Sequence, residues 1–372
     1  MWFLGLPTTS GKSILITGAI LLVILFTLIL RKLAVYLDKD RNGKKGRCDK
    51  CLHEPSKGKA TASSGDVVVI RTYPLEELRL ATSDFKFRIG AGTCYCVYLA
   101  ELGEGRFGAV KRLRVERGGN KKMFLDEVSA LLRISHPNII ELLGFCCEGG
   151  EQLLLLEHVP SGNLFDRLHT PKGHSSGILT WSNRVKIALG IARALMYLHH
   201  QADPPVIHRY VKSSSILLIN ENHAKLADFG LCKTSSESYF SQTPCIIKGS
   251  VGHVDVNYLR TGMVSPKNDV YSYGVLLLEL ITGLKSMQRL ATLPEWTEDT
   301  RKKIDDDKGL MELLDPKLNH EADIHQLKVL VDIANSALID YPEERPDMKG
   351  IVNRIASCME PVAPVDLPVH RK

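Results

Sequence analysis

The stretch SILITGAILLVILFTLIL at residues 13–30 constrains the fold more than any other part of this 372-residue chain, because its eighteen residues carry no charge. As a helix it would extend about 27 Å at ~1.5 Å per residue, which is long enough to cross the hydrocarbon core of a bilayer. Lys12 is the only basic residue before it, whereas eight lysines and arginines follow at 31–50. The positive-inside rule then places the following residues in the cytosol.

This pattern predicts one transmembrane helix at 13–30 in the plasma membrane, a short extracellular segment at 1–12 and a cytoplasmic remainder. A cleaved signal peptide and a buried core helix are the two alternatives. The run is longer than the apolar part of most signal peptides, and no small-x-small cleavage site follows it. It is also apolar on all sides and flanked by bases rather than by caps, which disfavours a core helix.

The charge and the cysteines narrow the class of protein further. The net charge of +6 has its basic excess directly after the apolar run, and no basic stripe interleaved with aromatic residues follows. We therefore expect contact with a membrane and no nucleic-acid partner. The nine cysteines are odd in number and scattered, which predicts reduced thiols in the cytosol. Residues 31–84 are expected to form a juxtamembrane linker, 85–358 one globular domain and 359–372 a C-terminal tail.

Three features early in this domain are candidates for a nucleotide site. Gly90 and Gly92, in a strand-like stretch, allow a hairpin whose backbone could lie against phosphates. Lys111 follows on a predicted third strand, and Glu127 lies on an amphipathic helix that begins near Phe124. Each of these charges, taken alone, would more often be a solvated surface residue. Their order along the chain is what makes them informative.

In this order the elements resemble the protein-kinase signature set of Gly-rich loop, strand-three lysine and helix-C glutamate. The segment HRYVKSSSILL, which begins at His208, resembles the catalytic loop of that family, and Asp228-Phe229-Gly230 follows it. From about residue 73 to about residue 358 the chain is similar to the cytoplasmic part of plant receptor-like kinases. The resemblance includes the segments Glu77–Phe85 and Leu142–Cys146.

The resemblance implies an α+β fold with two lobes, a β-rich N-lobe and a helical C-lobe, preceded by the one transmembrane helix. It implies that Lys111 bridges the α- and β-phosphates of ATP, that Glu127 holds the lysine in place and that Asp228 binds Mg²⁺. Leu156 matches the gatekeeper position before the hinge. The nucleotide-binding residues implied in this way are Ile89, Gly90, Gly92, Val97, Ala109, Lys111, Glu127, Glu157, Val159, Lys212, Leu217 and Asp228.

Three positions in the expected nucleotide and catalytic site depart from the family pattern. Tyr95 stands in place of the third glycine of the loop, where its side chain hinders the approach of the backbone to the terminal phosphates. Tyr210 stands at the position of the catalytic base, and a phenol, which keeps its proton at neutral pH, cannot deprotonate a hydroxyl as a carboxylate does. Ser215 replaces the metal-binding asparagine and is too short to reach the same place.

Two further predictions concern the residues around the catalytic loop. Asp269 is expected to tie down the backbone of this loop. Val256 and Asn257 replace the proline and glutamate of the family, so the usual arginine partner of that glutamate, Arg345, is expected to have a weaker partner. The activation segment would then have a looser anchor.

The chain keeps the family's residues at positions that support the fold and lacks them at positions that carry out phosphoryl transfer. The resemblance therefore implies an inactive member of the family, or pseudokinase. Such a protein would act by binding an active receptor kinase, with ATP as a ligand and Mg²⁺ bound weakly. Two alternatives stay open. A weakly active serine/threonine kinase would work through Lys111, Lys212 and Asp228 with an unusual base. A nucleotide-free scaffold or decoy would leave the pocket unused.

Overall fold

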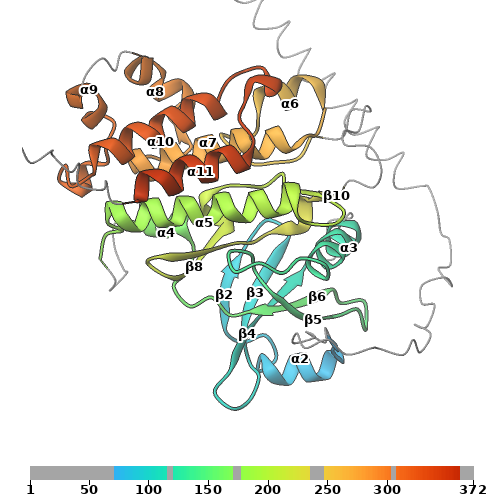
Figure 1. The fold of residues 1–372 in the computed structure, drawn as a ribbon. Coiled ribbons are helices and arrows are strands. Elements are labelled where there is room, and N and C mark those ends of the chain that lie inside the picture. Colours follow the sequence, from blue (N-terminus) through green and yellow to red (C-terminus); the bar gives the residue numbers. More distant parts are fainter. Residues whose placement is uncertain (1–70, 115–119, 171–176, 235–246, 303–306, 361–372) are drawn as a thin grey trace, which may run out of the picture. The chain divides into compact units, whose positions relative to one another are not determined.

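The computed structural model describes residues 71–360 except for 115–119, 171–176, 235–246 and 303–306 (Figure 1). The predicted transmembrane segment at 13–30 and most of the predicted tail lie outside the described residues. Within the described part of the chain, no helix has the length and apolar character that spanning a bilayer requires.

The first third of the described chain forms the β-rich lobe, a six-stranded sheet with two helices (Figure 1). The strand order is β1-β5-β6-β4-β3-β2, in which β1 pairs with β5 in parallel and all other neighbours are antiparallel. The elements are β1 (Arg71–Thr72), α2 (Leu75–Ala81), β2 (Arg88–Ala91), β3 (Tyr95–Glu101), β4 (Phe107–Leu113), α3 (Asn120–Leu131), β5 (Leu142–Cys146) and β6 (Leu153–Glu157).

Four consecutive leucines in β6 show how the sequence builds this lobe. Successive side chains of a strand point to opposite faces of the sheet. Leu153 and Leu155 therefore enter a small cluster beneath α2, where they pack with Leu78. Leu154 and Leu156 enter the main hydrophobic core, which continues into the helical lobe. The unbroken apolar run reflects a strand that is buried on both faces.

The remaining two thirds of the described chain form the helical lobe, so the predicted two-lobed fold is confirmed (Figure 1). Its helices are α4 (Leu164–His169), α5 (Trp181–His200), α6 (Val256–Thr261), α7 (Pro266–Thr282), α8 (Leu293–Lys302), α9 (Asp307–Met311), α10 (Ile324–Ala337) and α11 (Met348–Met359). Its short antiparallel strand pairs are β7 (Val206–Ile207) with β10 (Lys233–Thr234), β8 (Ile216–Asn220) with β9 (His223–Leu226), and β11 (Met287–Gln288) with β12 (Ala291–Thr292).

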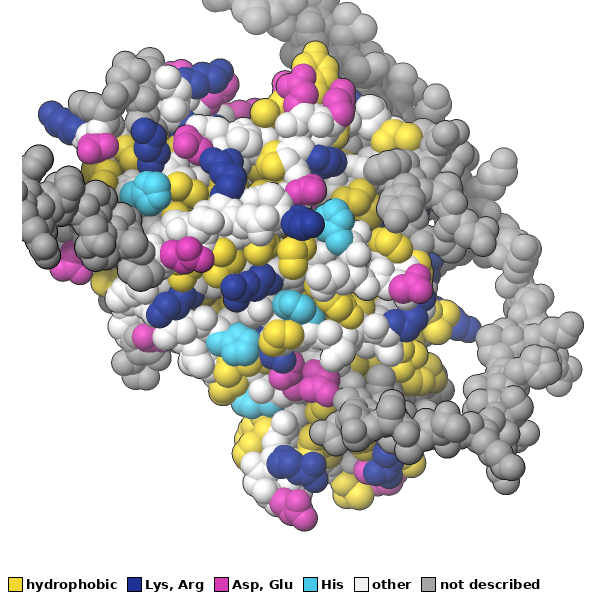
Figure 2. Space-filling model, viewed as in Figure 1, with side chains coloured by type: hydrophobic (Ala, Val, Ile, Leu, Met, Phe, Trp, Pro, Cys, Tyr) yellow, Lys and Arg dark blue, Asp and Glu magenta, His cyan; other side chains and the backbone are white. Residues whose placement is uncertain are grey.

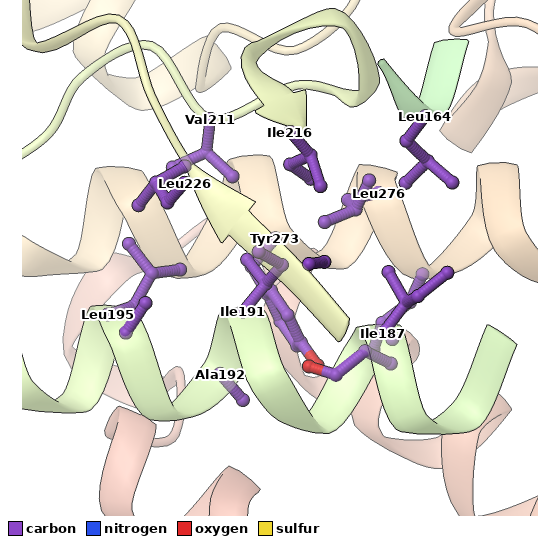
Figure 3. Packing of buried hydrophobic residues seen from close by; sticks show 14 of the residues in the cluster. Leu164, Ile187, Ile191, Ala192, Leu195, Val211, Ile216, Leu226, Tyr273 and Leu276 are labelled. Carbon is purple, nitrogen blue, oxygen red and sulfur yellow. The ribbon is translucent and has the colours of Figure 1, made fainter. Parts of the chain in front are cut away.

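Helix α7 is the centre of the helical lobe and is buried over nearly its whole length. It begins with Pro266 at a position where no backbone donor is needed, and it ends at Gly283, whose φ of 65° favours glycine. The hydroxyl of Tyr273 donates to the carbonyl of Ala188 in α5 over 2.9 Å. Figure 3 shows this tyrosine among apolar side chains of α5, the β8–β9 hairpin and the catalytic loop. The same core therefore supports the loop in which the candidate catalytic residues lie.

The expectation of a weaker partner for Arg345 is wrong, because Asp255 takes the place of the missing glutamate. The guanidinium forms a two-pronged ion pair with this carboxylate, with N to O distances of 2.7 and 2.9 Å, and both side chains are fully buried. Asn268 donates a further hydrogen bond to Asp255 over 2.7 Å. Asp255 also accepts from the backbone N–H of Asn257 at the start of α6. The end of the activation segment is firmly anchored.

Charged side chains of both signs lie interspersed over the described residues of the face shown in Figure 2. A mixed surface of this kind produces little of the single-sign field that attracts a polyanion. The lack of a nucleic-acid partner nevertheless stays a prediction from the sequence.

Candidate nucleotide-binding and catalytic site

The expected ion pair between strand three and helix C is present. Lys111 of β4 donates to both carboxylate oxygens of Glu127 in α3 over 2.8 and 2.9 Å, and both residues are buried. Burial lowers the pKa of Lys111, but the carboxylates of Glu127 and Asp228 outweigh this effect and place its pKa above the ordinary value. The lysine is therefore a permanent cation between the lobes.

Asp228 lies where a metal ligand of the family would lie, at the start of a short 3₁₀ turn over Phe229–Leu231. Its backbone is left-handed, with φ 67° and ψ 59°, an arrangement that is uncommon outside glycine and held here by its surroundings. The next residue, Phe229, is fully buried and packs edge-to-face on His208 with 4.7 Å between ring centroids. This packing fixes the direction in which the Asp228 carboxylate points.

Both oxygens of the Asp228 carboxylate already have partners inside the protein. Oδ1 accepts from Lys111 over 3.1 Å. Oδ2 accepts from the hydroxyls of Tyr95 and Ser215, each over 3.2 Å. Burial alone would raise the pKa of Asp228, but the lysine and the hydrogen bonds from Lys111 and Tyr95 hold this pKa below its ordinary value. The carboxylate is charged, and two of its three partners occupy positions that differ from the family pattern.

Tyr95 points into the site instead of only obstructing the tip of the loop. Its ring lies over the ammonium of Lys111, with 4.3 Å from Nζ to the ring centroid. Burial and the neighbouring Asp228 raise the pKa of this phenol, so it stays neutral and acts as a hydrogen-bond donor. The hairpin expected around Gly90 and Gly92 is formed by β2 and β3.

The expected contact of Gly90 and Gly92 with phosphates stays a prediction, but the structure gives Gly92 a second role. Neither Gly90 nor Gly92 has a positive φ, so their backbone conformation does not require glycine. A Cβ built on Gly92 would lie 2.7 Å from two ring carbons of Tyr95. In this chain, Gly92 provides room for the tyrosine ring.

The catalytic loop has the expected frame and an altered centre. Asp269 accepts hydrogen bonds from the backbone N–H groups of His208 and Arg209 over 2.8 and 2.7 Å, as predicted. At the base position, the ring of Tyr210 lies beneath the ammonium of Lys212, with 3.9 Å from Nζ to the ring centroid. The lysine that would approach the transferred phosphate thus packs on an aromatic face where the family has a carboxylate.

The residues predicted around the adenine base are brought together from both lobes. Ala109 and Leu156 are buried in the main core, and Val97, Val159 and Leu217 are partly exposed at its edge. Their role in nucleotide binding stays a prediction. Ile89 and Glu157 are predicted for the same site, and their role in nucleotide binding also stays a prediction.

Ile89 is 48% exposed on β2. The carboxylate of Glu157 accepts from the backbone N–H of Glu141 over 2.8 Å and forms an ion pair with Lys225. The side chain of Glu157 is therefore committed to holding the sheet against the β8–β9 hairpin, and only its backbone is left for a ligand.

The buried histidines predict how stability depends on pH. Burial lowers the pKa of His208 and His253, so each stays neutral in the folded chain, whereas the unfolded chain takes up a proton near pH ~6.5. The free energy of unfolding should therefore fall as the pH drops below this value, by up to about 1.4 kcal/mol per pH unit for each histidine. Urea unfolding at pH 7.5, 6.5 and 5.5 measures the slope. His253→Gln should reduce it and His200→Gln, at an exposed site, should not; equal slopes in all three proteins would contradict the prediction.

Comparison with known proteins agrees with this geometry. Residues 84–355 match the family model of the protein kinase domain. Calcium/calmodulin-regulated receptor-like kinase 1 of Arabidopsis thaliana is 37% identical over 284 residues, which cover 76% of this chain and 62% of that protein. Probable serine/threonine-protein kinase PBL6 of the same plant is 36% identical over 310 residues, covering 77% of this chain and 69% of the relative. Wall-associated receptor kinase-like 10, also from Arabidopsis thaliana, is 34% identical over 314 residues, which cover 82% of this chain and 40% of that protein.

The chain thus spans less than two thirds of the length of two of these three relatives. The family match covers well over half of the chain, and its bounds enclose the Lys111–Glu127 pair, the catalytic loop and Asp228. The chain therefore belongs to the protein kinase family, among the receptor-like kinases.

Proposed function

We propose that this protein is a membrane-anchored pseudokinase, a receptor-like kinase that does not transfer phosphate and signals by binding an active receptor kinase. The observation that carries the proposal is the base position, where Tyr210 packs beneath Lys212. A phenol in this place cannot orient and deprotonate an incoming hydroxyl as a carboxylate does, and losing a general base typically costs about 10²- to 10⁴-fold in rate.

The metal position supports the same proposal. Ser215 is fully buried, and its hydroxyl donates to Asp228 over 3.2 Å. This side chain cannot supply the amide oxygen that holds a second Mg²⁺ in active kinases. Asp228 fits one hard cation, since a charged carboxylate is the ligand that Mg²⁺ prefers, but that cation would have to displace two hydroxyl donors and a lysine. Weak binding of Mg²⁺ follows.

The buried contacts that hold the kinase fold together explain how a protein that transfers no phosphate could still signal. The Lys111–Glu127 ion pair, the Asp269 contacts to the catalytic loop and the Asp255–Arg345 pair hold α3, the catalytic loop and α6 in a defined arrangement. A rigid surface of this kind suits recognition by a protein partner, because little conformational freedom is lost on binding. The relatives named as receptor-like kinases make an active member of that family the most suitable partner class.

The proposed location rests on the sequence before the kinase-like domain. The uncharged run at 13–30 is followed by a dense group of basic residues at 31–50. Such a pattern anchors a chain in a membrane with its following domain on the cytoplasmic side. The relatives named as receptor kinases favour the plasma membrane. Residues 31–84 would then tether the domain close to the anionic lipid surface.

The decisive test is phosphoryl transfer by the full-length chain, purified in detergent, with labelled ATP, Mg²⁺ and a general protein substrate. We expect no more labelling than is seen with Lys111→Met, a variant that removes the expected phosphate contact and so reports contaminating kinases. Labelling well above that control would contradict the proposal and favour the weakly active serine/threonine kinase. If neither nucleotides nor nucleosides bind, the nucleotide-free scaffold is favoured instead.

A further inference from the structure

Tyr95 contacts the two groups that would receive the phosphates and the metal of a bound nucleotide. Its hydroxyl donates to Asp228 over 3.2 Å, and its ring lies 4.3 Å from the ammonium of Lys111. Gly92 leaves the space that the ring fills, since a Cβ there would lie 2.7 Å from it. The side chain of Tyr95 therefore contacts the carboxylate of Asp228 and the ammonium of Lys111, which the metal ion and the phosphates of a bound nucleotide would otherwise contact.

The position of Tyr95 along β3 limits what it blocks. Tyr95 and Val97 are two residues apart, so their side chains point to the same face of the sheet about 6–7 Å apart. Val97 pairs with Lys111 across the β3–β4 ladder, and the next pair on the same face is Leu99 with Ala109. Tyr95 thus covers the part of this face nearest Asp228. Val97, which is partly exposed, lies on the side of Leu99 and Ala109, which we call the apolar end.

The apolar end keeps the character of a slot for a flat ring. Ala109 and Leu156 are buried neighbours on adjacent strands, and Val159 and Leu217 are partly exposed beside the same core. A group of apolar side chains of this kind favours an aromatic heterocycle, because apolar surface leaves water on binding.

We propose that Tyr95 is an internal occupant of the phosphate end of this site, so that the site takes an uncharged adenine-type ligand, such as adenosine, in preference to ATP with Mg²⁺. The inference deepens the proposed function, because it concerns the nucleotide site of the same inactive domain. ATP can enter only by displacing the phenol from Asp228 and from the cation of Lys111, whereas adenosine leaves both contacts in place.

The test compares adenosine and ATP with Mg²⁺ by isothermal titration calorimetry on the full-length chain in detergent. The wild type should bind adenosine at least tenfold more tightly than ATP with Mg²⁺. Tyr95→Gly should bind ATP at least tenfold more tightly than the wild type does, while its affinity for adenosine changes less than threefold. Tyr98→Ala serves as the matched control, since Tyr98 packs against Phe85 on the opposite face of β3 and should leave both affinities unchanged.

Several results would overturn the inference. They are ATP binding by the wild type as tight as adenosine binding, no adenosine binding by the wild type at millimolar concentration, or an unchanged affinity for ATP in Tyr95→Gly. Tyr95→Ala provides the same comparison if thermal melting shows that the glycine variant is unfolded. None of these measurements involves turnover, so their failure leaves the argument from Tyr210 intact, and labelling of a substrate would contradict the proposed function separately.

Discussion

Restoring the three altered residues together, as Tyr95→Gly, Tyr210→Asp and Ser215→Asn, is expected to raise phosphoryl transfer by roughly 100- to 10,000-fold over the wild type. The aspartate supplies a base, and the asparagine supplies an oxygen for the second metal ion. The glycine frees Asp228 and Lys111 for the metal and the phosphates. The initial rate of labelling of a protein substrate, measured with saturating ATP and Mg²⁺, gives the gain.

The frame needed for this rescue is already in place, since Lys111 pairs with Glu127 and Asp269 holds the catalytic loop. Adding Lys111→Met to the triple variant should return the rate to background. Tyr210→Asp alone should recover only part of the activity, because the tyrosine of the loop would still occupy the site. A triple variant that binds ATP and Mg²⁺ yet shows no gain would contradict the assignment of Tyr210 and Ser215 as the cause of the proposed inactivity.

Replacing Asp255 with alanine is expected to lower the free energy of unfolding by about 3–5 kcal/mol. The reason is that Arg345 would keep its charge in a fully buried site without its carboxylate partner. The variant also loses the hydrogen bonds that Asp255 accepts from Asn268 and from the start of α6. Urea unfolding of the full-length chain in detergent, followed by tryptophan fluorescence, measures the loss.

Asn257→Ala is the matched control, because Asn257 stands at the family's glutamate position but is only partly buried. It should cost less than about 1 kcal/mol. Asp255→Asn keeps the shape of the side chain and the cap of α6 while removing the charge. Its loss in free energy of unfolding should therefore lie between those of Asp255→Ala and Asn257→Ala. If Asp255→Ala and Asn257→Ala cost the same, the Asp255–Arg345 pair is not the anchor of this segment.

These predictions differ in how far the sequence alone could lead to them. The two-lobed fold, the Lys111–Glu127 pair and the role of Asp269 could all be predicted, because the motifs in their order along the chain resemble those of the protein kinases and this resemblance implies them. The loss of a base at Tyr210 is also a matter of residue type. Chemistry that depends on what a side chain is can be predicted from the sequence.

The partner of Arg345 could not be predicted by aligning positions. Asp255 lies two residues before the expected glutamate, and only the path of the segment leading into α6 brings its carboxylate to the guanidinium. The sequence did contain one signal. Asp255 is the one acidic residue between Val251 and Tyr258, so it was the available carboxylate partner for an arginine. The contact joins residues 90 positions apart, so it depends on how the start of α6 lies against the segment before α11 rather than on local pattern.

The sequence by itself, through its resemblance to the protein kinases, therefore determined the family, the order of the motifs and the catalytic positions at which the residues of this chain differ. The tertiary structure alone decided where Tyr95 points and which carboxylate holds Arg345. Both depend on distances of a few ångströms between residues far apart in the sequence, and such distances are set by how the two lobes and the buried helices pack.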